Sequence, residues 1–347
     1  MVFCGDIAQP FVNASGLLLP DSLTRLVWIG NLEGSLIKEG GRNGVFNEYK
    51  AIENLCEKIP FKAFSIANNH LLDSSDVQTS LDNLAGLGAD SVGAGINLGD
   101  AARQLTIKDL DGLEYIVLAF GWKSIQCHVA TNSGQGVNPY TRENVVRCVG
   151  NALKKGVPVI CFLHWDYELE RYPQPYDRHL AHTLIDMGTA AVIGCHAHRV
   201  QPVEFYKGKP IVYGLGNFLF YQGHYFDGKL IFPKFCEEEY AFEINNGVYM
   251  LHHFHYNQQE NRLEYLKTEE IGPWTEFDGK AVFTGFSDKE YEEWFKEHRV
   301  QKKLLPVFYA KESAFSYWMK TEWIKIRGGI INVLTSMNLK SRNRANR

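Results

Sequence analysis

Apolar runs alternate with amphipathic stretches through the first two thirds of the chain. The runs short enough to form strands are residues 1–6, 25–33, 62–70, 157–166 and 190–198. The stretches with helical periodicity are 49–58, 142–155 and 176–187, and a further helix begins near Asp73 to Asp76 and is closed by Gly86 or Gly88. Strands that alternate with helices predict an α/β fold with a mostly parallel sheet and covering helices.

The pattern changes beyond Lys209. Short apolar strands in PIVYGLGNFLF and YAFEINNGVYMLHHFHYN predict antiparallel additions to the sheet. After about Asn257 the composition shifts to Glu, Lys and Trp. We therefore predict a main domain over residues 1–256 and a C-terminal extension over 257–347, which is α-rich, partly helical and basic at its end.

Composition and charge exclude several classes of protein. Apolar residues make up 45% of the 347 residues, enough for a sizeable core, and the net charge of -4 gives no field for nucleic acid. The seven cysteines contain no CxxC pair, so we expect them to be reduced and mostly buried. No signal peptide and no apolar window of the ~20 residues that a membrane span requires is visible. A soluble cytoplasmic protein is the expectation.

The segment 316–347 mixes large apolar side chains with basic ones. Its members are Trp318, Trp323, Ile324, Ile330 and Leu334 together with Lys320, Lys325, Arg327, Arg342 and Arg344. A basic amphipathic helix of this kind can lie on an anionic membrane as a peripheral contact. The alternative is that the helix packs on its own domain.

Side chains that bind metals follow five of the predicted strands. In chain order they are Asp6, then Asn31 and Glu33, then Asn69 and His70, then His164 with Asp166 and Glu168, and finally His196 and His198. Each one alone can be a turn cap, a helix cap or a satisfied core histidine. In open α/β sheets, however, ligands bind beyond the carboxyl ends of the strands. If all five groups share one edge of a sheet, they form a polar cluster that needs a function.

The histidine pair in AAVIGCHAHRVQP gives this cluster its chemistry. Side chains alternate along an extended strand, so we expect the rings of His196 and His198 to lie on one face and converge on one point. Imidazole, carboxylate and amide oxygen without cysteine suit Mn²⁺, Fe²⁺ or Zn²⁺. Two such ions about 3.5–4 Å apart would lower the pKa of a bridging water, which predicts hydrolytic chemistry.

Six motifs in order resemble one known family. They are GD at 5–6, NLE at 31–33, ANNHLLD at 67–73, LHWDYE at 163–168, LIDMGTAAVIGCHAHRVQPVE at 184–204 and IVYGLGNFLF at 211–220. Together they resemble the CapA family of poly-gamma-glutamate capsule biosynthesis proteins, a branch of the calcineurin-like metallophosphoesterase superfamily. The resemblance covers roughly residues 1–220. It implies a four-layer sandwich of two mixed β-sheets flanked by helices.

The resemblance also implies a dinuclear metal centre. Its two ions would be held as follows: one by Asp6 and His198, the other by Asn69, His164 and His196, with Glu33 bridging them. The family pattern usually reads GHHPH where this chain has GCHAH, so a neighbouring polar contact is lost while both ligands survive.

Three further residues receive roles from the same resemblance. His70 would be catalytic, donating a proton to the leaving oxygen or stabilising charge on the transferring group. Glu168 and Asn217 would contact the substrate or support the ligands. The superfamily commonly carries a histidine where this chain has Ala8, so one metal is expected to be held more weakly.

Two other patterns are not assigned to the site. GHYFDGKL at 223–230 mimics a phosphate loop, but Leu230 stands where a Ser or Thr is required. His253 and His255 in HHFHYN repeat the spacing of the first histidine pair without a carboxylate motif nearby. We expect them on a solvent-facing strand.

The sequence therefore predicts a metal-dependent hydrolase of phosphoesterase type that acts in capsule, poly-gamma-glutamate or exopolysaccharide biosynthesis. Its partners would be an anionic polymer or phosphoester substrate and a capsule-synthesis complex, and not nucleic acid. The alternative is a non-catalytic, metal-containing accessory protein that binds an anionic polymer or a synthase partner. Spacing does not name the substrate, because a dinuclear site hydrolyses phosphomonoesters, diesters or amides according to its pocket walls.

Overall fold

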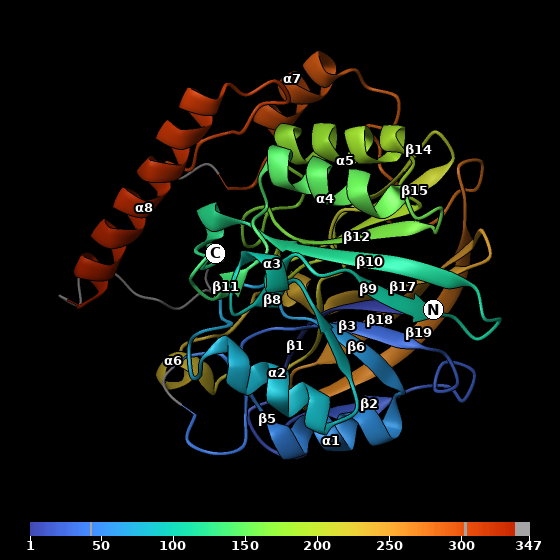
Figure 1. Cartoon of the computed structure of the whole chain (residues 1–347), viewed down its shortest axis with the longest axis vertical. Helices are drawn as coiled ribbons and strands as arrows, with labels where there is room; N and C mark the ends of the chain where they lie inside the picture. The colour runs from blue at the N-terminus through green and yellow to red at the C-terminus, as the bar shows by residue number, and fades with distance from the viewer. Residues whose placement is uncertain (42–43, 302–303, 337–347) are drawn as a thin grey trace.

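Two β-sheets packed face to face form the centre of the molecule. The computed structural model describes residues 1–41, 44–301 and 304–336. Helices α4 (Arg142–Leu153) and α5 (Pro175–Met187) cover one sheet, and α1 (Tyr49–Lys58) and α2 (Val77–Gly86) cover the other (Figure 1). The predicted four-layer sandwich of two mixed sheets is confirmed.

The larger sheet carries the N-terminal strand near its middle. Its order is β2-β19-β18-β17-β1-β3-β6-β7, with β16 also paired to β1. The bounds are β1 (Val2–Ala8), β2 (Gly16–Leu18), β3 (Trp28–Leu32), β6 (Phe61–Ser65), β7 (Asp90–Val92), β16 (Asn217–Phe220), β17 (Glu238–Asn245), β18 (Val248–Asn257) and β19 (Arg262–Ile271). Strands β1, β3, β6 and β7 run parallel, whereas β17 and β18 are antiparallel neighbours, as predicted. Strand β19, which was not predicted, pairs antiparallel with β18.

The second sheet has the order β14-β15-β13-β12-β10-β9. Its bounds are β9 (Leu105–Lys108), β10 (Glu114–Gly121), β12 (Val159–His164), β13 (Ala191–Cys195), β14 (Val203–Tyr206) and β15 (Lys209–Val212). The inner strands β10, β12, β13 and β15 are parallel. Phe3 of β1 meets Phe162 of β12 edge to face at 5.6 Å between ring centroids, so the two sheets share one core.

Shorter elements complete the body of the fold. They are the paired strands β4 (Ser35–Ile37) and β5 (Phe46–Glu48), the paired strands β8 (Ala94–Gly95) and β11 (Gly136–Val137), the helices α3 (Leu98–Ala101) and α6 (Tyr225–Gly228), and the 3₁₀ turns Lys123–Ile125 and Lys234–Cys236. The cysteines are all unpaired, and six of the seven are buried, as the sequence predicts.

The C-terminal region continues the larger sheet before it becomes helical. The β18–β19 hairpin turns just after Asn257, where we predict the boundary, so the first strand of the predicted extension belongs to the same sheet as β18. The helices α7 (Asp288–His298) and α8 (Ala314–Ser336) follow. The Glu170 carboxylate accepts hydrogen bonds of 2.9 Å from the backbone N–H groups of Val300 and Gln301, which fixes the chain between these helices to the body. The division into two domains stays a prediction.

One expectation about β18 is wrong. His253 is buried, with 7% of its surface exposed, and its Nε2 lies 2.7 Å from a carboxylate oxygen of Glu269 on β19. Its side chain is therefore buried beside Glu269 and not on a solvent-facing strand, while His255 is partly exposed, with 41% of its side chain accessible.

Candidate metal centre

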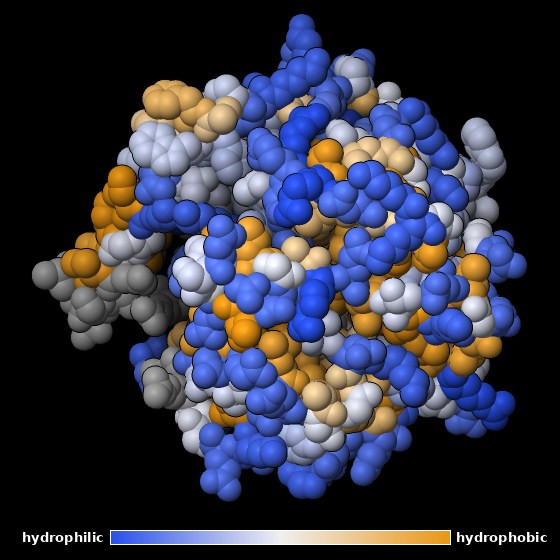
Figure 2. All heavy atoms as spheres, in the orientation of Figure 1, coloured by the Kyte–Doolittle hydropathy of each residue, from blue (hydrophilic) through white to orange (hydrophobic). Residues whose placement is uncertain are grey.

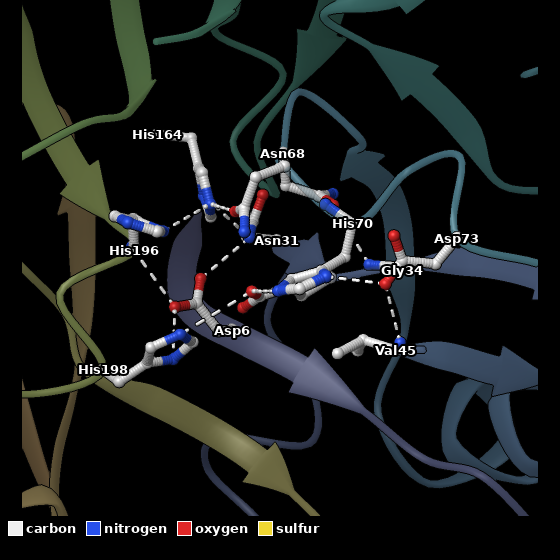
Figure 3. Close-up of polar contacts among 12 residues, drawn as sticks. Asp6, Asn31, Gly34, Val45, Asn68, His70, Asp73, His164, His196 and His198 are labelled. Carbon is white, nitrogen blue, oxygen red and sulfur yellow. Dashed lines mark hydrogen bonds and ion pairs between the residues drawn. The ribbon is translucent and has the colours of Figure 1, made fainter. Parts of the chain in front are cut away.

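The predicted site residues come from the strand ends of both sheets. Asp6, Glu33 and Asn69 follow or lie within β1, β3 and β6 of the larger sheet, whereas His164 ends β12 and His196 follows β13 of the second sheet. The expectation of one shared sheet edge is therefore wrong in detail. Two facing sheets bring their ends together, and the side chains meet between them (Figure 3).

Asp6 reaches the centre because β1 is irregular at this point. Its pairing with β3 shifts between Cys4 and Asp6, so that Gly5 is an extra residue and the bulge re-aims the next side chain. A Cβ on Gly5 would lie 2.0 Å from the Gly216 carbonyl oxygen, so the close approach of β16 requires glycine here. Asp6 is fully buried, and one of its oxygens accepts a 2.8 Å hydrogen bond from the Asn31 amide.

His196 and His198 converge for a different reason from the one expected. Strand β13 ends at Cys195, and both histidines lie beyond it with φ of 91° and 54°, so strand alternation does not apply. The left-handed backbone costs about 1–3 kcal/mol per residue and persists only where the surroundings hold it. The N–H of His196 donates to Asp6 at 3.2 Å, and the Ala197 carbonyl accepts from the Leu169 N–H at 2.8 Å.

His164 joins the two sheets at the centre. Its Nε2 lies 2.8 Å from the Asn69 amide oxygen and 3.1 Å from His196 Nδ1. Its Nδ1 lies 3.4 Å from the side-chain N–H₂ of Asn31, which also donates to Asp6. Asn31 therefore orients two predicted ligands at once, a role that sequence reasoning did not assign to it.

Glu33 lies between three imidazoles. One of its carboxylate oxygens is 3.7 Å from His198 Nε2 and 3.8 Å from His70 Nε2. Glu33, His196 and His198 are all buried, and one potential ligand atom from each lies within 4.8 Å of the others. This is the spacing of side chains that surround a cation, because each ligand atom binds a divalent ion at about 2.0–2.2 Å.

His70 is held from behind by a carboxylate. Its Nδ1 lies 2.7 Å from Asp73 Oδ2, and the same oxygen accepts a 2.9 Å hydrogen bond from the Val45 N–H. The His70 side chain is 15% exposed, in contrast to the buried Glu33, His164 and His198, and its ring centroid lies 5.9 Å from that of Phe226. His70 is therefore an oriented imidazole at the accessible side of the cluster, and Asp73 is a site residue that sequence reasoning read only as part of a helix start.

The two remaining predicted residues differ in their surroundings. Asn217 is buried, and its amide oxygen lies 2.9 Å from His198 Nδ1, so it orients the ring with Nε2 toward Glu33. Glu168 is half-buried and near Cys236, where its negative charge contributes to raising the pKa of the thiol. A role for Glu168 at the centre stays a prediction.

Burial controls the protonation of the cluster. It raises the pKa of Asp6 to about 7, although hydrogen bonds from Asn31 and the His196 N–H oppose the shift. It lowers the pKa of His164 well below its usual value, and the neighbouring His196 and His198 add to this effect. Glu239 on β17, which sequence reasoning missed, is a further buried carboxyl whose pKa is raised well above its usual value by burial and by Asp6.

These properties suit a bound cation. A neutral imidazole such as His164 presents a nitrogen lone pair, and the buried Asp6 carboxyl forms no ion pair with a lysine or arginine within residues 1–41, 44–301 and 304–336. The Asn31 amide oxygen is also buried without a hydrogen-bond partner in these ranges. A divalent ion would supply the positive charge and favour the ionised carboxylates. The donor set of nitrogen and oxygen atoms therefore fits a divalent metal.

The surroundings of Ala8 fit a metal ion less well than the rest of the centre does. It is buried in an apolar cluster that includes Phe220, Tyr225 and Phe232. Phe232 also packs against the His198 ring at 4.4 Å between centroids. Aromatic side chains thus surround Ala8, and the segment 223–230, rejected as a phosphate loop, provides part of this wall together with Phe232.

Sequence comparisons relate the chain to capsule proteins. A family model described as bacterial capsule synthesis protein PGA_cap matches residues 21–222, more than half of the chain. The PGA biosynthesis protein CapA of Bacillus subtilis (strain 168) is 32% identical over 165 residues, which are 47% of this chain and 43% of that protein. A probable polyglutamine synthesis accessory protein of Mycobacterium tuberculosis (strain H37Rv) is 32% identical over 165 residues, 44% of this chain and 43% of that protein. The chain spans less than half the length of these curated relatives.

Comparison with solved structures gives more distant likenesses. A 5'-nucleotidase precursor from Thermus thermophilus has a TM-score of 0.35 at 13% identity, covering 71% of this chain and 44% of that one. The NAD nucleotidase of Haemophilus influenzae has a TM-score of 0.34 at 8% identity, covering 70% of this chain and 46% of that one.

Proposed function

The chain belongs to the bacterial capsule synthesis protein family PGA_cap, and from this we propose that it is a metal-dependent hydrolase of phosphoesterase type acting in capsule or poly-gamma-glutamate biosynthesis. The observation that carries the proposal is the buried cluster in which Glu33, His196 and His198 offer ligand atoms within 4.8 Å of one another. Such a cluster is costly to bury unless a cation neutralises it.

Two divalent ions, with Mn²⁺, Fe²⁺ or Zn²⁺ suiting the donors best, are the cofactors of this proposal. The residues that would hold them are Asp6, Glu33, Asn69, His164, His196 and His198. When bound, such ions polarise a phosphoester and lower the pKa of coordinated water. Asn31 and Asn217 keep the ligands oriented through the 2.8 Å bond to Asp6 and the 2.9 Å contact with His198.

His70 would act on the substrate from the accessible side. Its Nδ1 is occupied by Asp73, so its Nε2 faces the centre and can donate a proton to the leaving oxygen or a hydrogen bond to the transferring group. Asp73 positions the ring by accepting the Nδ1 proton, so Nε2 donates to the substrate when both ring nitrogens are protonated. Phe226 lies beside the His70 ring and Phe232 packs against the His198 ring, so these two aromatic side chains narrow the space around the two imidazoles.

A panel of phosphomonoesters, phosphodiesters and amides, assayed with the purified chain and added Mn²⁺, tests this proposal. We expect turnover of at least one phosphoester and loss of that activity when a chelator removes the metal. Restoration by Mn²⁺ serves as the control for irreversible damage. A chain that binds metal and turns over no member of the panel would instead favour the accessory function.

The accessory function is the second candidate, and one observation favours it. The apolar cluster around Ala8 leaves one metal position with fewer ligands than the superfamily provides. A centre that holds its metal weakly suits binding of an anionic polymer or a synthase partner better than repeated turnover. The Mycobacterium tuberculosis relative is described as a probable polyglutamine synthesis accessory protein, which also supports a synthesis complex as the partner.

Peripheral contact with an anionic membrane is part of the proposed function, and α8 would provide it. Figure 1 shows α8 (red) extending away from the body, and apolar atoms are visible on it in Figure 2. Large apolar side chains with 44–71% of their surface exposed follow one face of the helix: Phe315, Trp318, Met319, Trp323, Ile326, Ile330 and Val333. At 100° per residue they fall within about 140° of arc. The opposite face contacts the body, where Tyr317 Oη accepts from Trp122 Nε1 and Thr321 meets Ser124 at 3.0 Å.

Charge favours a lipid surface as the occupant of this face. The sequence after Glu322 contains no Asp or Glu and six basic residues, of which Lys340, Arg342, Arg344 and Arg347 lie outside the described residues. Basic residues near an anionic surface contribute about 1 kcal/mol each. None of the helices in the described ranges is long and apolar enough to cross a membrane.

Cosedimentation with lipid vesicles tests the membrane contact. The wild-type chain is expected to bind vesicles that contain phosphatidylglycerol and not vesicles of phosphatidylcholine alone. Ile326→Glu should weaken binding at least about tenfold, because it places a charge in the apolar face. Leu110→Glu, at an equally exposed apolar residue in the β9–β10 turn (61% exposed), is the control and should bind as wild type. If Ile326→Glu binds the vesicles as tightly as the wild-type chain, the membrane contact is contradicted. It is also contradicted if the wild-type chain is a dimer and Ile326→Glu is a monomer.

A further inference from the structure

A cavity lies apart from the candidate metal centre. It has a volume of about 630 Å³ and opens between the loop after His198 and the strands β17, β18 and β19. None of the predicted metal ligands lines it. Four cationic side chains do: Arg171, Arg199, Lys267 and Lys280.

The two lysines are already neutralised by carboxylates. Lys267 pairs with Asp278 and lies 3.0 Å from Glu269. Lys280 lies 2.7 Å from Glu276. These pairs form the rim of the cavity and leave little charge for a ligand.

The two arginines lack such partners. Neither Arg171 nor Arg199 forms an ion pair within the described ranges, and each guanidinium lies over an aromatic ring, at 5.3 Å from Tyr172 and 4.3 Å from Phe235. The Arg199 Nε is buried and has no hydrogen-bond partner among these residues, while one terminal nitrogen makes only a 3.4 Å contact with the Leu169 carbonyl. Two stacked guanidiniums with unused donors are the usual receptor for an oxyanion.

We propose that this cavity binds a carboxylate group of an acidic, amide-linked chain. The arginines would hold the carboxylate, and Glu238, an exposed carboxylate that also lines the cavity, would accept an amide N–H of the same chain. A simple anion would meet the arginines equally well and would gain nothing from Glu238. The choice of an amide-linked polyacid rests on the proposed function in capsule synthesis, whereas the cationic cavity does not depend on it.

The cavity and the candidate metal centre share one loop. Arg199 follows His198 directly, and a Cβ on Gly216 would lie 3.1 Å from the Glu238 carbonyl oxygen and 3.3 Å from the Val200 nitrogen. The carbonyl of the same Gly216 accepts a hydrogen bond from the N–H of Asp6 at 3.2 Å. A chain bound in the cavity would therefore be retained beside the centre, where a second part of it could be processed or held.

Calorimetric titration of the full chain with a γ-linked oligoglutamate, and separately with inorganic phosphate, tests this proposal. The oligoglutamate is expected to bind more tightly than phosphate. Arg171→Gln should weaken its binding about tenfold or more, because a charged hydrogen bond is lost. Arg171 is exposed, so this variant is expected to fold, and Arg199→Lys provides a second variant that keeps the charge and loses the planar fork. Arg25→Gln, at an exposed arginine that does not line the cavity, is the control.

Two outcomes would overturn the proposal: wild-type binding by Arg171→Gln, or equal affinity for phosphate and oligoglutamate. If Arg171→Gln binds as wild type and His196→Ala does not bind, the polyacid is placed at the metal centre. Metal content and any phosphoesterase activity toward small substrates should be unchanged in Arg171→Gln. A chain without phosphoesterase activity that still binds oligoglutamate through Arg171 would refute the enzymatic proposal and support this one.

Discussion

Replacement of His196 by alanine is expected to strip the candidate centre of bound metal. His196 Nδ1 lies 3.1 Å from His164 Nε2, and a ring nitrogen of His196 also belongs to the compact group with Glu33 and His198. The substitution therefore removes a nitrogen donor that lies close both to His164 and to the group of Glu33 and His198. Loss of residues that merely orient a ligand costs about 10–100-fold in metal affinity, so loss of this ligand should cost at least about 100-fold. Inductively coupled plasma mass spectrometry should find about two transition-metal ions per wild-type chain and close to none in the variant.

A second histidine provides the matched control. His255 on β18 has 41% of its side chain exposed and lies outside the cluster. The His255→Ala variant should therefore contain as much metal as the wild-type chain. Circular dichroism and a melting curve would establish that His196→Ala is folded. A wild-type chain that folds fully, contains no metal and takes up no Mn²⁺ would remove the metal centre from the proposed function.

The elements were predictable where local signals and burial agree. Helix α1 spans Tyr49–Lys58 as predicted, and Asp76 caps α2 by accepting a 2.8 Å hydrogen bond from the Thr79 N–H. Strand β10 was not predicted, although its apolar run over 114–121 gave a signal. Strand β19 gave almost none, because charged residues on its exposed face interrupt the alternation. The division of the strands between two sheets is a tertiary property, since a buried strand has the same pattern in either sheet.

The site was predictable to the extent that metal-type side chains end strands. That rule located Glu33 and His164. It also placed Asp6 at a strand end, although β1 continues to Ala8, and strand alternation gave the wrong reason for the convergence of His196 and His198, which lie beyond β13 with positive φ. Asn31 acts only through contacts across the fold, and the Arg171–Arg199 cavity joins loops that are distant in sequence. Asp73 lies only three residues from His70, but its role depends on a turn that the sequence reads equally well as a helix start. No local pattern distinguishes such residues from ordinary surface or capping positions.

Replacement of His70 by alanine is expected to lower kcat about 10²–10⁴-fold while the metal content stays at the wild-type level. His70 is the one imidazole of the cluster that has a carboxylate, Asp73, 2.7 Å from one nitrogen and 15% of its side chain exposed. Its Nε2 is 3.8 Å from Glu33, too far for a direct hydrogen bond and close enough to reach a substrate at the centre. Steady-state kinetics on any phosphoester found active, with metal analysis of the same preparation, measures both quantities.

The leaving group separates proton donation from a structural role. An aryl phosphate has a leaving oxygen that needs little protonation, whereas an alkyl phosphate depends on an acid, so His70→Ala should lose far more activity on the alkyl ester. Asp73→Asn should show the same selectivity with a smaller loss, because the ring remains and only its orientation and the charge of its Nδ1 partner are changed. An equal loss on both esters would assign His70 to charge stabilisation of the transferring group. Full activity in His70→Ala would leave the cluster without its proposed acid, and the binding function of the centre would then explain the buried carboxylates and imidazoles better than catalysis.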